Sequence, residues 1–252
     1  MNHLDGQLDE TIVDVRHARA PGPVVVVCEH ASPHIPATMA NLGLADAALL
    51  SHVAWDPGAL GLATRMAERL HATLIASKTS RLVYDCNRPP DAPDAMPARS
   101  EVVDVPGNAD LSDAQKAERV SIYYEPFRAA LSCILAGIAD PILVTVHSFT
   151  PIYHGALREV EIGVLHDRDT RLADALLAAP DPRYVVRRNE PYGPGDGVTH
   201  TLKTHGLPGG FLNVMLEVRN DLIADEDAQA AMADGLSEWI GRALADLKVS
   251  AC

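Results

Sequence analysis

Four short segments place polar side chains that could do chemistry at the end of an apolar run. They are "VVVVCEHASP" (24–33), "SRLVYDCNRPP" (80–90), "ILVTVHSFTP" (142–151) and "VMLEVRND" (214–221). Such apolar runs, rich in β-branched residues, predict strands buried on both faces of a sheet. Because ligands of layered α/β proteins bind at the carboxyl ends of the strands, these polar residues predict one shared site.

Two histidines, His30 and His147, are candidates for a common metal ion. One histidine after a strand is usually a hydrogen-bonded structural residue, but two that end strands of one sheet favour a metal. Catalytic zinc takes about three protein ligands, so a further ligand is expected. Asp56 in "HVAWDPGA" ranks first, although an aspartate before a helix is most often an N-cap. Glu29 ranks second, because strand neighbours face opposite sides, and His34 ranks third.

The segment "DCNRPP" places Asp85, Asn87 and Arg88 together. Asparagine and proline favour a turn, which is the structural explanation. An arginine beside an asparagine amide also makes a good clamp for a substrate carboxylate, because guanidinium binds carboxylate through two parallel hydrogen bonds. Asp85 would hold the arginine or brace the loop. Ser80 and Arg81 begin this predicted strand, so we expect them at the opposite end of the sheet.

Glu217 lies inside an apolar strand, with Arg219 two positions later on the same side. A buried glutamate is costly unless it is paired or catalytic. We therefore consider a Glu217–Arg219 ion pair and a general-base role for Glu217, with Arg219 orienting the base.

Residues 190–210, "EPYGPGDGVTHTLKTHGLPGG", form a glycine- and proline-rich loop that could fold over the site. It offers Tyr192, Asp196, His200 and His205. Most residues in such a loop are solvated; Tyr192 and His205 are the ones we expect to contact substrate.

The order of elements predicts a three-layer α/β sandwich, in which helices flank a mixed, mostly parallel central sheet, as a single domain over residues 1–252. A long loop is expected at 89–108, with Asp110 or Ser112 capping the helix that follows it. The predicted strands are 24–28, 73–77, 82–86, 141–146, 160–167, 183–189 and 214–218, and the predicted helices are 58–71, 111–139, 170–179 and 225–247.

Composition narrows the class of protein. The formal net charge of −13 and an aromatic content of 4% argue against nucleic acid or an anionic membrane as partner. The polar stretch 1–20 predicts no signal peptide, and no apolar run is long enough to span a bilayer. Scattered cysteines without a CxxC pair (Cys28, Cys86, Cys133 and Cys252) fit reduced thiols, so we expect a cytoplasmic protein.

Together with "HVAWDPGA" and "LEVRNDLI", the motifs "CEHASPHIP", "SRLVYDCNRPP" and "VTVHSF" resemble the N-formylglutamate amidohydrolase family over about residues 22–240. Three of these blocks also look like the zinc carboxypeptidase core. The resemblance implies that Asn87 and Arg88 hold a substrate carboxylate, that His147 binds zinc and that Glu217 is the general base. Carboxypeptidase-type sites take two ligands from a His-x-x-Glu segment, but here Pro33 stands three residues after His30, which leaves the second ligand open.

The resulting hypothesis is a Zn²⁺-dependent hydrolase, with another divalent ion possible, that cleaves the amide bond of N-formyl or other N-acyl amino acids such as N-formyl-L-glutamate, a step in amino-acid catabolism. Two alternatives remain. One is a non-catalytic amino-acid- or metal-binding protein on the same fold. The other is a metal-free acyl hydrolase that uses Ser148 or Ser32, although the chain lacks a GxSxG motif.

Overall fold

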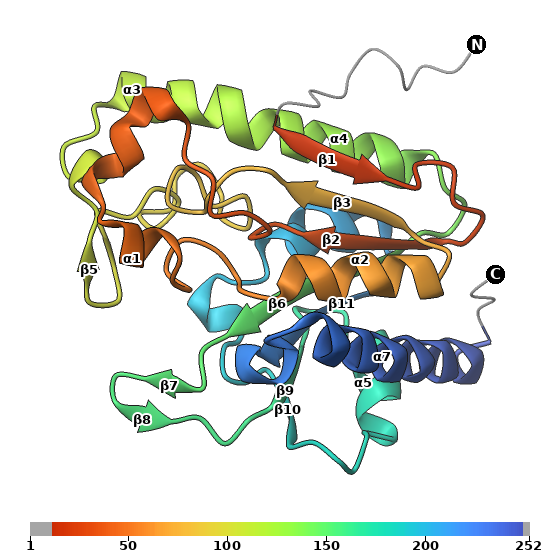
Figure 1. Cartoon of the computed structure of the whole chain (residues 1–252). Coiled ribbons are helices and arrows are strands. Elements are labelled where there is room, and N and C mark those ends of the chain that lie inside the picture. Colours follow the sequence, from red (N-terminus) through yellow and green to blue (C-terminus); the bar gives the residue numbers. More distant parts are fainter. Residues whose placement is uncertain (1–11, 249–252) are drawn as a thin grey trace.

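A seven-stranded mixed sheet forms the middle layer of the protein. The computed structural model describes residues 12–248 (Figure 1). The strands lie in the order β1-β3-β2-β6-β11-β9-β10. Their bounds are β1 Val13–Arg16, β2 Val24–Cys28, β3 Thr73–Ser77, β6 Ile142–Phe149, β9 Ile162–Leu165, β10 Val186–Arg188 and β11 Asn213–Arg219.

The centre of this sheet is parallel and its edges are mixed. Strands β3, β2, β6 and β11 run parallel to one another. At one edge β1 is antiparallel to β3, and at the other β9 is antiparallel to β11 and parallel to β10. The predicted mixed, mostly parallel sheet is therefore confirmed. The central strands end on the same side, where their polar residues gather.

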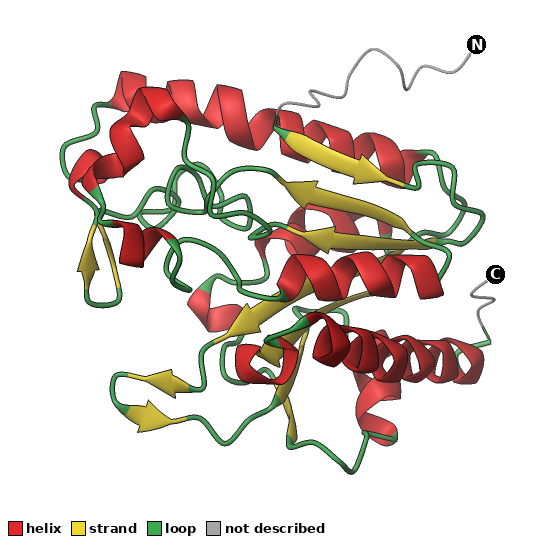
Figure 2. Cartoon of the chain, viewed as in Figure 1, coloured by secondary structure: helices red, strands yellow, loops and turns green. Residues whose placement is uncertain are grey.

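Helices cover both faces of the sheet (Figure 2). Helices α2 (Ala59–Arg69), α5 (Arg171–Ala178) and α7 (Glu226–Asp246) pack on one face, and α4 (Glu125–Ala136) packs on the other. Alternate residues of β2 point to the two layers: Val24, Val26 and Cys28 face α2, whereas Val25 and Val27 face α4. This period of two, with apolar residues at every position, is what a strand buried on both faces requires.

The predicted helices form at the expected places, with local causes visible in the sequence. Helix α2 buries a stripe that includes Leu62, Ala63 and Met66. Ser112, one of the two predicted caps, starts α3 (Asp113–Arg119) in a capping box with Gln115. A π-helical turn (Val120–Tyr124) joins α3 to α4 within the single helix predicted for 111–139.

One predicted strand, 82–86, is wrong: these residues form turns after β3. Side chains and nearby loop carbonyls, rather than a neighbouring strand, satisfy their backbone groups. Asn108 donates to the carbonyl of Leu82 at 2.8 Å, Arg119 donates to that of Val83 at 3.2 Å, and Ser80 Oγ accepts from Leu82 N at 3.1 Å. The run is apolar because it is buried, and burial alone does not distinguish a strand from a packed turn. Arg81 consequently lies at the carboxyl end of the sheet, not at the opposite end.

The remaining elements of the described chain are short. The predicted loop 190–210 contains a π-helical turn (Leu202–Gly206) and α6 (Leu207–Gly209). The loop 89–108 contains a hairpin of β4 (Arg99–Ser100) and β5 (Val103–Asp104), and a second hairpin follows β6. This second hairpin consists of β7 (Ile152–Tyr153) and β8 (Ala156–Leu157). The short helix α1 spans Asp46–Leu49.

Three of the four cysteines lie in the described part of the chain. Cys28 and Cys86 are buried free thiols, and Cys133 is a half-buried one. Cys252 lies outside the described residues. So do residues 1–11, which make up about half of the 1–20 stretch for which no signal peptide is expected. Between residues 12 and 248, no helix is both long enough and apolar enough to cross a bilayer.

Gly58, the N-cap of α2, makes the turn that follows Asp56 possible. Its φ is +81°, and an added Cβ would lie 2.5 Å from the Ile223 carbonyl oxygen. We expect Gly58→Ala to lower the free energy of unfolding by about 1–3 kcal/mol, because the substitution adds left-handed strain and a backbone clash. Gly241→Ala in α7 is the control, since nothing lies within 4 Å of its added Cβ. Urea denaturation should show that Gly241→Ala leaves the free energy of unfolding unchanged or raises it. Equal losses of this free energy in both variants would contradict the role of Gly58.

Candidate metal centre

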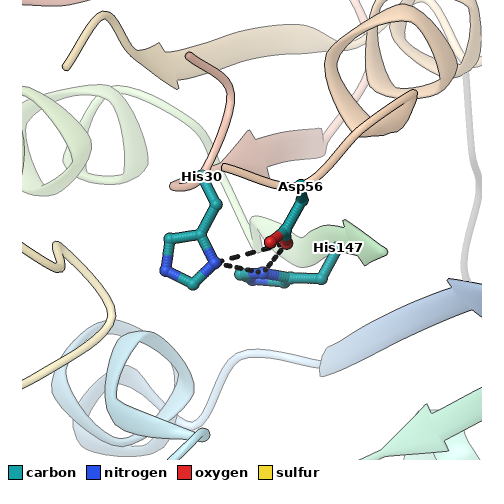
Figure 3. Close-up of side chains that lie close together, drawn as sticks. All are labelled: His30, Asp56 and His147. Atoms are coloured by element: carbon teal, nitrogen blue, oxygen red, sulfur yellow. Dashed lines mark hydrogen bonds and ion pairs between the residues drawn. The ribbon is translucent and has the colours of Figure 1, made fainter. Parts of the chain in front are cut away.

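His30, Asp56 and His147 point toward one another in a buried cluster at the carboxyl end of the sheet (Figure 3). The Nδ1 atoms of His30 and His147 lie 3.2 Å apart. Asp56 Oδ2 lies 3.3 Å from His30 Nδ1 and 3.0 Å from His147 Nδ1. The side chains come from three distant parts of the sequence, and this group could hold a metal ion.

The local backbone explains how the three side chains meet. His147 lies in β6, while His30 follows β2 in a turn. The backbone N–H of Asp56 donates to the carbonyl of His30 at 2.9 Å, which joins the two turns. Asp56 Oδ2 also accepts from the backbone N–H of Ser148 at 3.2 Å. The Asp56 side chain is therefore turned to the histidines, and the N-cap position of α2 belongs to Gly58.

The spacing of the three atoms fits a tetrahedral zinc site. Ligand atoms about 2.0–2.1 Å from a tetrahedral ion lie roughly 3.3 Å from each other. The observed separations are 3.0, 3.2 and 3.3 Å. Two imidazole nitrogens and one carboxylate oxygen are also a donor set that zinc accepts.

Carboxylates on the far side of each imidazole direct the Nδ1 atoms into the cluster. His30 Nε2 donates to Asp85 Oδ1 at 2.7 Å, which leaves a lone pair on Nδ1. His147 Nε2 lies 3.1 Å from Glu29 Oε2, although the angle is poor for a hydrogen bond. Metal-binding histidines commonly have such carboxylate partners. Glu29, the second-ranked ligand candidate, thus contacts the outer nitrogen of His147, and third-ranked His34 is exposed.

The acids of the cluster favour positive charge at its centre. Burial disfavours a charged His147, but the attraction of Glu29 and Asp56 outweighs burial and raises the pKa of that imidazole well above its usual value. Burial likewise disfavours the Asp56 carboxylate, but the two histidines lower its pKa. Such a site stabilises a cation, either as protons on the imidazoles or as a metal ion.

Glu217 lies beside this cluster. It is the register partner of His147 on the neighbouring strand β11, and it lines the same cavity as the three cluster residues. Its Oε2 is buried and has no hydrogen-bond partner in the described chain. Burial raises the pKa of Glu217 to about 7, and Asp56 adds to the rise while His147 opposes it. A buried carboxyl with this pKa, directed at a cavity, has the properties of a general base.

Arg81 is a cavity residue that sequence reasoning missed. Its guanidinium lies 2.9 Å from Asp85 Oδ2 and 3.5 Å from Asp56 Oδ1. The cavity, of about 370 Å³, places this cation next to the cluster and Glu217. The signal was the spacing of four residues between Arg81 and Asp85, which fits a contact in a helical turn but not along the strand predicted there.

Asn87 and Arg88 also line the cavity, but much of their hydrogen-bonding capacity is used. Asn87 Nδ2 donates to the Val198 carbonyl at 2.5 Å, and its Oδ1 accepts from Thr201 N at 3.0 Å. Arg88 Nε donates to Asp94 at 2.6 Å, and Nη1 donates to backbone carbonyls. Asn87 thus joins the 85–88 turn to residues 198–201. Arg88 Nη2 donates to no group in the described chain, so it is available to bind a ligand.

The other predicted site residues divide into one at the cavity and two away from it. Tyr192 lines the cavity. His205 does not; its Nδ1 lies 3.3 Å from Ser132 Oγ on α4, because the chain from 200 to 209 is helical and carries it to that side.

Arg219 contacts Asp221 at 2.8 Å and Glu161 at 3.2 Å. These partners turn its side chain away from Glu217, so the expected Glu217–Arg219 pair does not form.

Comparison with known proteins agrees with the fold and the motifs. The model of the family "N-formylglutamate amidohydrolase" matches residues 22–224. This chain belongs to that family. The match covers all five segments that carry the cluster and its neighbours, including the one with Asp56. It makes this protein a member of a family of amidohydrolases.

Two solved structures are similar to this family member over nearly their whole length. A gene product of Agrobacterium tumefaciens is 54% identical, with a TM-score of 0.92 and coverage of 96% of this chain and 99% of that one. An N-formylglutamate amidohydrolase from Ralstonia eutropha is 18% identical, with a TM-score of 0.60 and coverage of 94% and 98%. The second likeness concerns the fold alone. Comparison with curated proteins gave no match.

Substitution of single histidines tests whether the cluster binds metal. We expect purified wild-type protein to carry about one divalent ion per chain, and His30→Ala to lose it because a ligand of a three-residue site is removed. His34→Ala is the matched control, since it removes an exposed histidine four residues away. Elemental analysis after dialysis reads the ion content. Equal content in all three proteins would show that the cluster is not the metal site.

Proposed function

We propose that this family member is a metal-dependent amidohydrolase that cleaves the amide bond of N-formyl or other N-acyl amino acids, such as N-formyl-L-glutamate, and releases the free amino acid. The observation that carries the proposal is the position of Glu217. Glu217 lines the same cavity as the His30–Asp56–His147 cluster, and its buried Oε2 has no hydrogen-bond partner among the described residues. Family membership supports the reaction class, and the name of the Ralstonia eutropha relative supports the substrate.

The residues present fit a divalent ion, and Zn²⁺ suits their chemistry and spacing. His30, Asp56 and His147 would hold it, with Asp85 and Glu29 keeping the imidazoles oriented. When bound, the ion would polarise the amide carbonyl and make a water molecule more acidic.

Glu217 moves the proton in the proposed reaction. Its carboxylate accepts a proton from the attacking water and then delivers it to the nitrogen of the leaving amine. The register of β11 against β6 keeps the carboxylate beside His147. Because two paired strands hold Glu217 beside His147, little motion is needed to bring the base and the reacting atoms together.

Arginines bind and polarise the substrate. Arg88 Nη2 binds the substrate carboxylate, while the Asp94 contact and the carbonyls of Asn87 and Gly197 hold the guanidinium in place. Arg81, next to the cluster, stabilises the negative charge that develops on the amide oxygen. The role of Asn87 is to fix this turn against residues 198–201.

The geometry gives little support to a serine nucleophile. Ser148 Oγ donates to the carbonyl of Pro57 at 2.7 Å, and the imidazole of the preceding residue belongs to the metal cluster. Ser148→Ala should therefore retain turnover.

Replacement of the base separates catalysis from binding. Glu217→Gln should lower kcat by at least about 100-fold, because the amide cannot accept the proton, while leaving the ion content unchanged. Glu238→Gln, on the exposed face of α7, is the control. Turnover would be followed by release of the free amino acid. If Glu217→Gln kept full activity with its metal, the proposed base would be wrong.

The role of Arg88 is tested with two substrates that differ only at the carboxylate. Wild-type protein should prefer an N-formyl amino acid to its carboxamide. Arg88→Met should raise KM for the acid by about tenfold or more, because a charge-assisted hydrogen bond is lost. KM for the carboxamide should change little. An equal loss on both substrates would assign Arg88 a structural role instead.

A further inference from the structure

Arg158 lies at the centre of a group of aromatic rings on one side of the cavity. Its guanidinium carbon is 4.3 Å from the ring centre of Tyr153, 4.9 Å from that of Tyr192 and 5.4 Å from that of Phe149. Its Nη2 also donates to the hydroxyl of Tyr192 at 2.9 Å. A cation over aromatic faces is attracted to them, and more strongly when it is removed from water. Phe149, Tyr153 and Tyr192 all line the cavity, and we call them the aromatic wall.

The aromatic wall comes from three separate segments. Phe149 ends β6, Tyr153 belongs to the β7–β8 hairpin, and Tyr192 belongs to the loop after β10. Figure 1 shows the hairpin projecting beyond the sheet. Within the described chain its two strands pair only with each other, and its Ile152 and Leu157 side chains are 57% and 72% exposed. Apolar burial at these positions therefore does little to hold the hairpin against the cavity.

Arg219 holds residues 158–161, the segment that follows the β7–β8 hairpin. Its Nη1 donates to the carbonyl of Arg158 at 3.2 Å, and its backbone N–H donates to the carbonyl of Glu161 at 2.9 Å. The end of β11, two residues after Glu217, thus anchors the chain that leaves the hairpin. Arg158 also donates through Nη1 to the carbonyl of Thr150 at 3.3 Å, at the start of the hairpin. Arg158 therefore joins both ends of the hairpin to the loop that carries Tyr192.

We propose that Arg158 is a positioning residue that holds the aromatic wall at the cavity and so sets the affinity for substrate. None of the three rings belongs to the His30–Asp56–His147 cluster, and Glu217 is the proposed base, so displacement of the wall affects binding rather than the chemical step. The kinetic part of this inference rests on the proposed function, but the structural part does not.

Hydrogen exchange tests the structural part without any substrate. Arg158→Met should speed amide exchange in residues 150–157 and in residues 189–197, two segments far apart in sequence. Arg158→Lys, which keeps a charge but loses the planar fork, should lie between wild type and Arg158→Met. Arg168→Met is the matched control, because the side chain of Arg168 is 89% exposed. Unchanged exchange in both segments of a folded Arg158→Met protein would overturn the inference.

Steady-state kinetics tests the functional part. Arg158→Met should raise KM roughly tenfold, the scale of a partly buried cation–π contact together with its hydrogen bond, and should leave kcat and ion content near the wild-type values. Tyr192→Phe keeps the ring and removes the hydroxyl, so we expect a smaller rise in KM that does not add to that of Arg158→Met. A fall in kcat at unchanged KM would overturn the inference. Should wild-type protein hydrolyse no N-acyl amino acid, the proposed function fails and the exchange data alone decide whether Arg158 holds the wall.

Discussion

Two imidazole Nδ1 atoms and one carboxylate oxygen meet within 3.0–3.3 Å of each other, and much of the surrounding structure makes this arrangement possible. Three electron-pair donors at such separations repel one another unless a positive charge lies between them. Asp85 accepts a hydrogen bond from the outer nitrogen of His30, and the Glu29 carboxylate lies 3.1 Å from the outer nitrogen of His147, which favours inner lone pairs directed at the common point. The cluster could therefore hold a cation, and its spacing fits one face of a tetrahedral zinc site.

The sheet brings these side chains together by its topology. Strands β2, β6 and β11 are parallel neighbours, so the residues after their apolar runs meet at one edge. Alternation along β11 separates the functional and packing faces: Leu216 and Val218 pack against the helices of one layer, while Glu217 faces the cavity. A shift of register by one residue would exchange these faces, so burial of the apolar residues also fixes the proposed base.

Arginines stabilise the loops around the site, in a protein whose formal net charge is −13. Arg81 contacts Asp85 and Asp56. Arg88 joins the 85–88 turn to Gly197, and Arg119 holds the turn after β3 through the carbonyl of Val83. Arg219 anchors the segment that follows the β7–β8 hairpin. A guanidinium has five donors in a rigid plane, so one side chain can satisfy several carbonyls of irregular backbone. These contacts join irregular loops at the carboxyl end of the sheet to one another.

The sequence by itself determined the layered α/β fold, the central strands and the long helices, because their apolar periodicity does not depend on distant partners. It also predicted His30 and His147, since polar residues after buried strands lie at the carboxyl edge of the sheet, and it ranked Asp56 first among three candidates for a further ligand. Tertiary structure decided what depends on contacts between distant segments. It replaced the strand expected at 82–86 by a packed turn, which brought Arg81 to the cluster. It also paired Arg219 with Glu161 and carried His205 to α4. Spacing along a chain places a residue on an element, but the partner of a long polar side chain depends on which loops the fold brings within its reach.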